Sequence, residues 1–253
     1  MADGPPQQQR RLVAVGHKAY LGYAETLAWL EAAAGPAQQA RDVDVVVFPV
    51  ALALPAAMSS GRDAYAVGAQ DLSDRPAGAF TGELPAALLS EVGVRYVEIG
   101  HAERRFLFGD TPDVVARKIA VAVEHGLTPL VCVGEGRLGD TEVVPVEEAI
   151  EQAGRQLAEA LERVPGGTEL VVAYEPVWAI GAEEPAGVEH ITRVAAGLRP
   201  QLSAHQSARL IYGGTAGPGL FAHLREAVDG LFLGRRAHSP AAFADILGEV
   251  ATV

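Results

Sequence analysis

The chain carries its apolar residues in short, continuous blocks that are separated by longer stretches with helical periodicity. A continuous apolar block indicates a strand that is buried on both faces, as in a parallel sheet covered by helices. Eight blocks predict strands, at residues 12–15, 43–48, 64–67, 96–99, 129–133, 170–174, 209–212 and 230–233. Helices are predicted between them, at residues 24–34, within 49–60, and at 85–92, 112–125, 146–163, 188–198, 219–227 and 240–250.

Strands that alternate with helices in this way predict a single-domain α/β protein, a (β/α)8 barrel over residues 11–253. Residues 1–10 have no apolar pattern and are predicted to form a disordered N-terminal tail. The alternative is an open doubly wound sheet, in which the fingerprint G-x-G-x-x-G usually follows the first strand. After Val15 the chain reads GHKAYLGY, so the barrel is favoured.

Charge and composition restrict the class of protein. The 253 residues include 20 basic and 32 acidic side chains, for a net charge of -12, which argues against a general nucleic-acid binder. A small anionic substrate needs only a local positive site and stays possible. The single cysteine, Cys132, precludes an internal disulfide, and no apolar run approaches the ~20 residues of a membrane helix, so a cytoplasmic protein is expected.

The residues just after the predicted strands are candidates for chemistry, because catalytic groups of such barrels lie at the carboxyl ends of the strands. These positions hold a carboxylate, an imidazole and an ammonium group, and glycine-rich turns follow the seventh and eighth strands. Such groups suit abstraction of a proton beside the carbonyl of a sugar phosphate, with backbone N–H groups holding the phosphate. The side chains concerned are His17, Lys18, His101, Glu103, Glu135 and Glu175.

Each candidate also has an ordinary structural explanation. A lone histidine such as His101 is often a hydrogen-bonded structural residue, and Lys18 could be solvated. Glu103 and Glu135 could pair with nearby cations, Arg104 or Arg105 among them. Glu175 is the strongest candidate, because a buried strand seldom leads into an unpaired charge. No metal or cofactor is predicted, because the other six histidines show no metal-ligand spacing: His17, His125, His190, His205, His223 and His238.

Several stretches resemble the triosephosphate isomerase family, in the order and spacing of that family and over nearly the whole chain. They read VGAQD, GAFTGE, LLSEVGVRYVEIGHAERR, FGDT, CVGE, AYEPVWAIG, YGG and DGLFLG. The resemblance implies the TIM barrel fold and a homodimer. It also implies aldose–ketose isomerisation of a small phosphorylated sugar without a cofactor, a reaction of glycolysis and gluconeogenesis. The segment GAFTGE, with Thr81 near its tip, resembles the loop that inserts into the partner subunit.

The resemblance also assigns roles, which are those already established for that family. Glu175 is then the base, His101 the neutral electrophile and Lys18 the essential cation, with Glu103 beside them. Phosphate contacts fall on Gly181, Gly213, Gly214, Thr215 and Gly234. The lid that closes over the phosphate comprises residues 176 to about 186, among them Pro176, Val177, Trp178, Ala179, Ile180, Gly181, Pro185 and Ala186.

The chain departs from the family pattern at four places. Gly16 replaces the asparagine that touches substrate, with His17 in place of the usual tryptophan, so a polar contact is lost and space is expected to open. The distal half of the lid reads AEEPA, which introduces two acids and a proline. Thr215 replaces serine and keeps its hydroxyl. Arg235 replaces the second glycine of the eighth loop, and its guanidinium could face the ligand or point away.

Three functions are therefore compatible with the sequence. The first is interconversion of dihydroxyacetone phosphate and glyceraldehyde 3-phosphate, favoured by the three retained catalytic residues. The second is isomerisation of a four-carbon ketose phosphate such as L-erythrulose 1-phosphate, because a glycine followed by arginine in the eighth loop resembles a branch of the family with that activity. The third is a paralogue without catalytic activity. The sequence does not distinguish a dimer from a tetramer.

Overall fold

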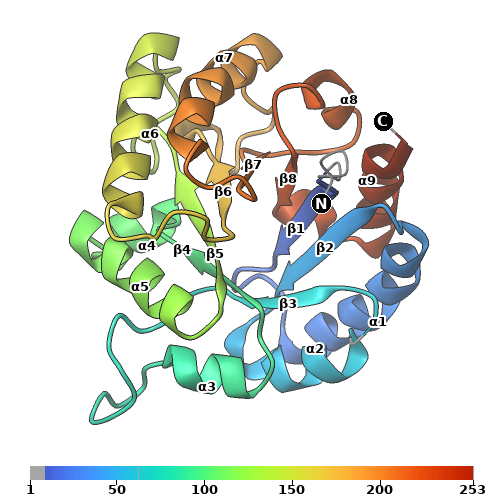
Figure 1. The fold of residues 1–253 in the computed structure, drawn as a ribbon. Coiled ribbons are helices and arrows are strands. Elements are labelled where there is room, and N and C mark those ends of the chain that lie inside the picture. The colour runs from blue at the N-terminus through green and yellow to red at the C-terminus, as the bar shows by residue number, and fades with distance from the viewer. Residues whose placement is uncertain (1–8, 62, 253) are drawn as a thin grey trace, which may run out of the picture.

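The protein forms a closed barrel of eight parallel strands, β1 to β8 in chain order, in the residues that the computed structural model describes, 9–61 and 63–252. The predicted tail at residues 1–10 lies mostly outside the described residues. The strands are β1 (Arg11–Gly16), β2 (Val43–Phe48), β3 (Ala66–Ala69), β4 (Tyr96–Ile99), β5 (Thr128–Val133), β6 (Val171–Tyr174), β7 (Arg209–Tyr212) and β8 (Gly230–Leu233). Figure 1 shows the helices arranged around this barrel, so the predicted (β/α)8 architecture is confirmed.

The helices follow the strands in sequence and cover the outside of the barrel (Figure 1). Their bounds are α1 (Tyr23–Gln39), α2 (Leu54–Ser60), α3 (Ala86–Glu91), α4 (Ala102–Leu107), α5 (Pro112–Glu124), α6 (Val146–Leu161), α7 (Val188–Leu198), α8 (Phe221–Leu224) and α9 (Pro240–Thr252). Short 3-10 helices occur at Ala51–Ala53, Val177–Ala179, Arg199–Leu202 and Arg235–Ala237.

Two apolar cores result from the alternation of side chains along each strand. Val13 and Val15 of β1 point outwards into the larger core between strands and helices. Leu12 and Ala14 point inwards, where they pack with residues such as Cys132 and Phe232. The same alternation directs every second residue at the carboxyl end of a strand toward the mouth of the barrel.

Two predicted boundaries were wrong because an apolar run does not mark where strand pairing begins or where a helix stops. The third strand spans Ala66–Ala69 instead of 64–67, because Ala64 and Tyr65 close a turn by donating their N–H groups to Gly61. The first helix was predicted to end at residue 34, yet α1 passes through Pro36 to Gln39, and Ala37 continues its buried face.

Two other helices also differ from prediction. The expected helix at residues 219–227 is reduced to the single turn α8, Phe221–Leu224. The helix α4, Ala102–Leu107, was not predicted, because its apolar residues do not form a buried stripe: Phe106 and Leu107 are 46% and 64% exposed. Its start is set locally by His101, whose ring accepts a hydrogen bond from the Glu103 backbone N–H.

Candidate active site

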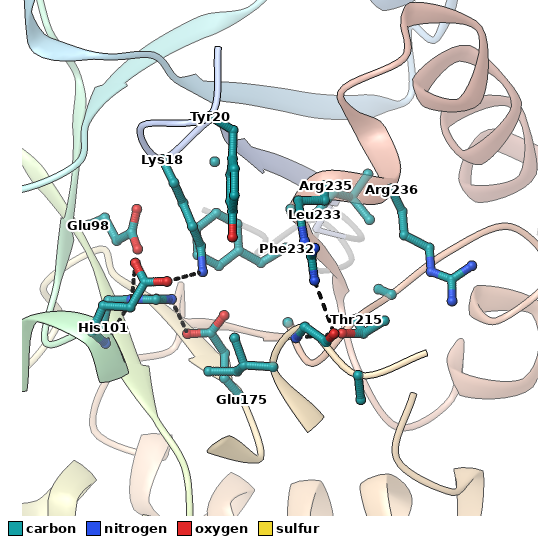
Figure 2. Close-up of a pocket in the computed structure, with 18 of the residues that line it drawn as sticks. Lys18, Tyr20, Glu98, His101, Glu175, Thr215, Phe232, Leu233, Arg235 and Arg236 are labelled. Atoms are coloured by element: carbon teal, nitrogen blue, oxygen red, sulfur yellow. Dashed lines mark hydrogen bonds and ion pairs between the residues drawn. The ribbon is translucent and has the colours of Figure 1, made fainter. Parts of the chain in front are cut away.

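A pocket of about 560 Å³ opens at the carboxyl ends of the strands. Its walls come from the segments that follow β1, β4, β6, β7 and β8, so side chains distant in sequence meet there. Figure 2 shows Lys18, Glu98, His101 and Glu175 on one side of the pocket, with Thr215 and Arg235 on the other. Of the candidates at strand ends, Lys18, His101, Glu103 and Glu175 line the pocket, whereas His17 and Glu135 do not.

Lys18 is held next to Glu103. Its Nζ donates a hydrogen bond to Glu103 Oε1 at 2.8 Å, and the backbone of Lys18 has a φ of 48°, a left-handed conformation that turns the chain sharply after β1. Burial acts to lower the pKa of Lys18, but the hydrogen bond and charge of Glu103, together with nearby Glu175 and Glu98, raise it overall. A lasting positive charge therefore faces the pocket. Gln70 supports this turn by donating from Nε2 to the Lys18 carbonyl at 3.0 Å.

His101 is buried and presents one nitrogen to the pocket. Its Nδ1 accepts the Glu103 N–H at 3.2 Å, so in the neutral ring Nε2 carries the proton. His101 Nε2 lies 3.8 Å from Glu175 Oε2. Burial lowers the pKa of His101, opposed by the charge of Glu175 and assisted by that of Lys18. The result is a neutral imidazole that can donate a hydrogen bond to a ligand.

Glu175 follows β6 directly and is only 6% exposed. Its backbone N–H continues the sheet by bonding to the Val133 carbonyl, which explains how a charge can lie at the end of a buried strand. Among the described residues its Oε2 has no hydrogen-bond partner. Gly213 gives the side chain its space, because a Cβ there would lie 2.7 Å from Glu175 Cγ and Oε1.

The segment after Glu175 is attached to the barrel at several points. Trp178 Nε1 donates to Glu135 Oε1 at 2.9 Å, and the Ala186 N–H donates to Tyr212 Oη at 3.1 Å. Glu135 also lies 3.1 Å from His190 Nε2 and does not pair with Arg104 or Arg105 in the described residues. Of the predicted lid residues, Pro176 to Ala186, three line the pocket: Ile180, Gly181 and Ala182.

The residues expected to contact phosphate lie at the opposite wall. Thr215 Oγ1 accepts the Gly181 N–H at 3.1 Å and donates to the Ala179 carbonyl at 2.7 Å. Gly213 and Gly234 line the same wall, while the carbonyl of Gly214 accepts the Tyr212 hydroxyl. The Gly181 N–H and the Thr215 hydroxyl thus bond to each other at this wall, and the Gly213 N–H bonds to the Tyr174 carbonyl.

Arg235 faces this wall, which settles the direction that the sequence left open. Its Nη2 donates to the Gly181 carbonyl at 3.0 Å, and its guanidinium lies 5.6 Å from the centre of the Tyr20 ring. Arg236 donates to the carbonyl of Glu183, within the unusual AEEPA part of the lid. Both arginines therefore hold backbone of the predicted lid, and both line the pocket (Figure 2).

The space around Gly16 differs from the prediction. The missing side chain was predicted to open space, yet a Cβ at Gly16 would lie 3.3 Å from two ring carbons of Phe232. The Phe232 ring has taken part of that space. On the other side, Glu98 Oε2 lies 4.0 Å from the same Cβ position. Gly16 does line the pocket, but between an aromatic ring and a carboxyl group.

Glu98 and Gln70 were missed by sequence reasoning. Glu98 lies inside β4 and not after it, so a search limited to residues beyond the strand ends passes over it. Its signal was a charge in the middle of an apolar strand, two residues after Tyr96 and therefore on the same, inward face. Gln70 contacts backbone alone, which no spacing in the sequence indicates.

The remaining predicted residue, Thr81, lies away from the pocket. It is exposed in the segment between β3 and α3, which projects from the barrel in Figure 1. Within the described residues no group of three or more His, Cys, Asp or Glu side chains is arranged to hold a metal ion. Over the same residues, no helix has the length and apolar character needed to cross a membrane.

Comparison with known proteins matches this chain to one family. The family model described as triosephosphate isomerase matches residues 11–250. An L-erythrulose-1-phosphate isomerase from Pectobacterium atrosepticum is 44% identical, over 94% of this chain and 95% of its own. A triosephosphate isomerase from Leifsonia xyli is 37% identical over 91% of both chains. A probable triosephosphate isomerase 2 from Listeria monocytogenes is 34% identical over 96% of this chain and 98% of its own.

Proposed function

The chain belongs to the triosephosphate isomerase family and is an isomerase, and we propose that it moves a proton between adjacent carbons of a short ketose phosphate through an enediolate. The observation that carries the proposal is the approach of Glu175 Oε2 to His101 Nε2, at 3.8 Å, beside the ammonium group of Lys18. A base, a neutral hydrogen-bond donor and a cation around one cavity are what proton abstraction next to a carbonyl requires.

Each group has one role in this reaction. Glu175 takes the proton from the carbon next to the carbonyl, and its carboxylate is free to do so because no described residue bonds to Oε2. His101 donates from Nε2 to the oxygen that gains charge, while Lys18 stabilises that charge from the other side. Glu103 keeps Lys18 in place by its 2.8 Å hydrogen bond. This division of roles is the established pattern of the family.

The phosphate binds at the wall of Gly181, Thr215, Gly234 and Arg235. When the phosphate group is held at this wall, the carbonyl end of the substrate lies next to Glu175 and His101. The lid then excludes water, which strengthens the electrostatic interactions and protects the enediolate from losing phosphate. Arg235 would exchange its bond to the Gly181 carbonyl for one to phosphate oxygen, which is the stronger acceptor.

Two substrates have specific support. The four-carbon candidate, L-erythrulose 1-phosphate, is favoured by Arg235 in the pocket. It is also favoured by the relative named L-erythrulose-1-phosphate isomerase, which matches this chain over nearly its full length. Removal of the C3 proton would give a 2,3-enediolate, and protonation at C2 would then give erythrulose 4-phosphate. The three-carbon candidate, dihydroxyacetone phosphate, is favoured by the retained Lys18, His101 and Glu175 and by the relatives named triosephosphate isomerase.

Proton NMR in heavy water tests the proposal directly. Both substrates would be incubated side by side with the protein, and turnover and deuterium incorporation at the carbon next to the carbonyl would be followed. Incorporation with either substrate supports enediolate chemistry, and the faster substrate identifies the specificity. The absence of incorporation with both, in a protein whose circular dichroism spectrum shows a folded barrel, would contradict the proposal.

We also propose that the protein is a dimer that uses the segment between β3 and α3. This segment projects from the barrel, and exposed apolar side chains such as Phe80 and Leu88 lie in or next to it, at 42% and 47% exposure. Thr81→Arg places a bulky charge there and should shift the mass measured by light scattering at low micromolar concentration toward the monomer. An unchanged mass would remove Thr81 from the interface.

A further inference from the structure

We propose that Glu98 is a specificity residue, which binds the terminal hydroxyl of a substrate one hydroxymethyl group longer than dihydroxyacetone phosphate. This inference rests on the proposed isomerase function and concerns the end of the pocket away from the phosphate wall. Neither the predicted strand-end residues nor the proposed proton transfer uses Glu98.

The position of Glu98 is at the floor of the pocket. It lies on β4, faces the interior of the barrel, and is 7% exposed, yet it lines the cavity. Among the described residues, no hydrogen bond to its carboxyl group is formed, and its Oε2 lies 4.0 Å from the position that a Cβ on Gly16 would take. The Phe232 ring closes the other side of Gly16, so the floor offers one polar group in an apolar wall.

An unpartnered carboxyl group at this depth is costly unless a ligand uses it. Barrel interiors are filled mostly by branched apolar side chains, which would fit at this position without any polar requirement. Most interior side chains of this barrel follow that pattern, among them Val46, Leu130 and Ile211. Glu98 therefore breaks the local pattern at a point that a substrate can reach.

The protonation state of Glu98 suits a hydroxyl partner. Burial raises the pKa of Glu98 well above its usual range, and the negative charge of Glu175 raises it further, with Lys18 opposing both. A neutral carboxyl group has one O–H donor and acceptor capacity, as a hydroxyl does, so the two can form a donor–acceptor pair.

The orientation of the bound substrate points its additional hydroxymethyl group toward Glu98. Phosphate is held at the wall of Thr215 and Arg235, across the pocket from Glu98 (Figure 2). The carbon that loses its proton lies next to Glu175, on the far side of the carbonyl from the phosphate. In a four-carbon ketose phosphate this carbon carries the additional hydroxymethyl group, which extends away from the phosphate and toward the part of the pocket that Glu98 lines.

The test compares Glu98→Leu and Glu98→Gln with the wild type on L-erythrulose 1-phosphate and dihydroxyacetone phosphate. In Glu98→Leu the ratio of kcat/KM for the four-carbon to the three-carbon substrate should fall roughly 10-fold to 100-fold, because the hydroxyl loses its partner. Glu98→Gln keeps a donor and an acceptor in the same volume and should retain the ratio within about threefold. Thermal unfolding of each variant verifies that the barrel is intact.

Three results would overturn the proposal. Equal loss on both substrates in Glu98→Leu would make Glu98 a residue that positions the catalytic groups. An unchanged ratio would remove it from the site. A wild type that turns over dihydroxyacetone phosphate alone would refute the role of Glu98 while leaving the isomerase function intact.

Failure of the proposed function gives a different pattern. If the wild type turns over neither compound, calorimetric binding of the same two compounds still tests Glu98. Selective weakening of L-erythrulose 1-phosphate in Glu98→Leu would support the hydroxyl contact without catalysis. Equal binding of that compound by both proteins, or no binding by the wild type, would overturn it.

Discussion

Buried ionisable side chains have hydrogen-bond partners at the amino end of the barrel interior, whereas buried carboxyl groups lack them at the carboxyl end in the described residues. At the amino end, Arg209 on β7 is 4% exposed and is paired: Nη1 lies 2.6 Å from Asp44 Oδ2, and Nη2 donates to the Tyr96 hydroxyl at 3.2 Å. At the carboxyl end, Glu98 and Glu175 are 7% and 6% exposed and line the pocket, and Glu175 Oε2 has no hydrogen-bond partner among the described residues. Tyr96 and Glu98 stand two residues apart on the same face of β4.

This difference distinguishes buried polar groups that stabilise the fold from those that are available to a ligand. A buried charge without partners destabilises the folded state, so a fold tolerates it only where a ligand or a reaction uses it. The paired end contributes to a stable barrel, and the unpaired end is available to a substrate. The predictions below test this division, beginning with the largest expected effect.

Glu175→Gln removes the base and should lower kcat roughly 10³-fold to 10⁴-fold, because an amide cannot accept the proton. The free energy of unfolding should not decrease, since the change removes a buried charge with an unpartnered oxygen. Activity by NMR and denaturant unfolding measure the two effects. Retained turnover, or a protein that unfolds more easily, would place Glu175 among the structural residues.

Asp44→Ala, at the amino end of the barrel, should lower stability and leave catalysis nearly unchanged, which is the reverse of Glu175→Gln. Loss of Asp44 leaves the Arg209 guanidinium buried with the neutral Tyr96 hydroxyl and the more distant carboxylate of Glu169, at 3.6 Å, and should lower the free energy of unfolding by about 3 kcal/mol. The value of kcat should stay within a factor of two. Arg10→Ala is the matched control, because it removes the exposed partner of Asp44 and should cost less than about 1 kcal/mol. Comparable losses in the two variants would contradict the buried pair.

Gly213→Ala tests how closely the free carboxylate is positioned. The added Cβ would meet Glu175 Cγ and Oε1 at 2.7 Å and must displace them. A shift of about an ångström in a base is expected to cost roughly 100-fold in kcat. Thr215→Ala offers a comparison, since it alters the lid contact and leaves Glu175 in place, so the rate of proton abstraction should be less affected. Wild-type kcat in Gly213→Ala would show that the base does not need this position.

The smallest effect concerns His17, which tests whether lack of a partner is by itself a sign of function. His17 is buried against Trp29, neither ring nitrogen has a partner among the described residues, and it does not line the pocket. Burial, with the nearby His238, lowers the pKa of His17 to about 4. Between pH 7 and pH 5 the unfolded chain therefore binds a proton that the folded protein does not.

Acid should consequently destabilise the protein. With an unfolded pKa of about 6.5, the contribution of His17 is complete above that pH and decreases as the pH approaches 4, by about 2 kcal/mol at pH 5. His17→Phe keeps an aromatic ring beside Trp29 and should reduce this dependence, measured by denaturant unfolding at pH 7 and 5. An identical pH dependence in the variant would place the titrating group elsewhere.

Much of the site was predictable because its signals are local. Lys18, His101 and Glu175 each follow an apolar block, and a barrel brings the ends of its strands to one mouth. The missed elements lack such a signal. Helix α4 has exposed apolar residues and begins at a histidine cap, while Glu98 interrupts a strand in place of following it. The space at Gly16 was misjudged because Phe232 lies 216 positions later in the chain and nothing local links the two.

By itself, the sequence determined the barrel, its strand order and the group of side chains at its mouth, because these depend on the alternation of residues within short segments. Only the tertiary structure decided which charges are paired and which are free. Lys18 meets Glu103 across 85 positions, and Arg235 meets Gly181 across 54. Such contacts are set by how strands close into a barrel and how loops pack over it, so the periodicity of any one segment contains no information about them.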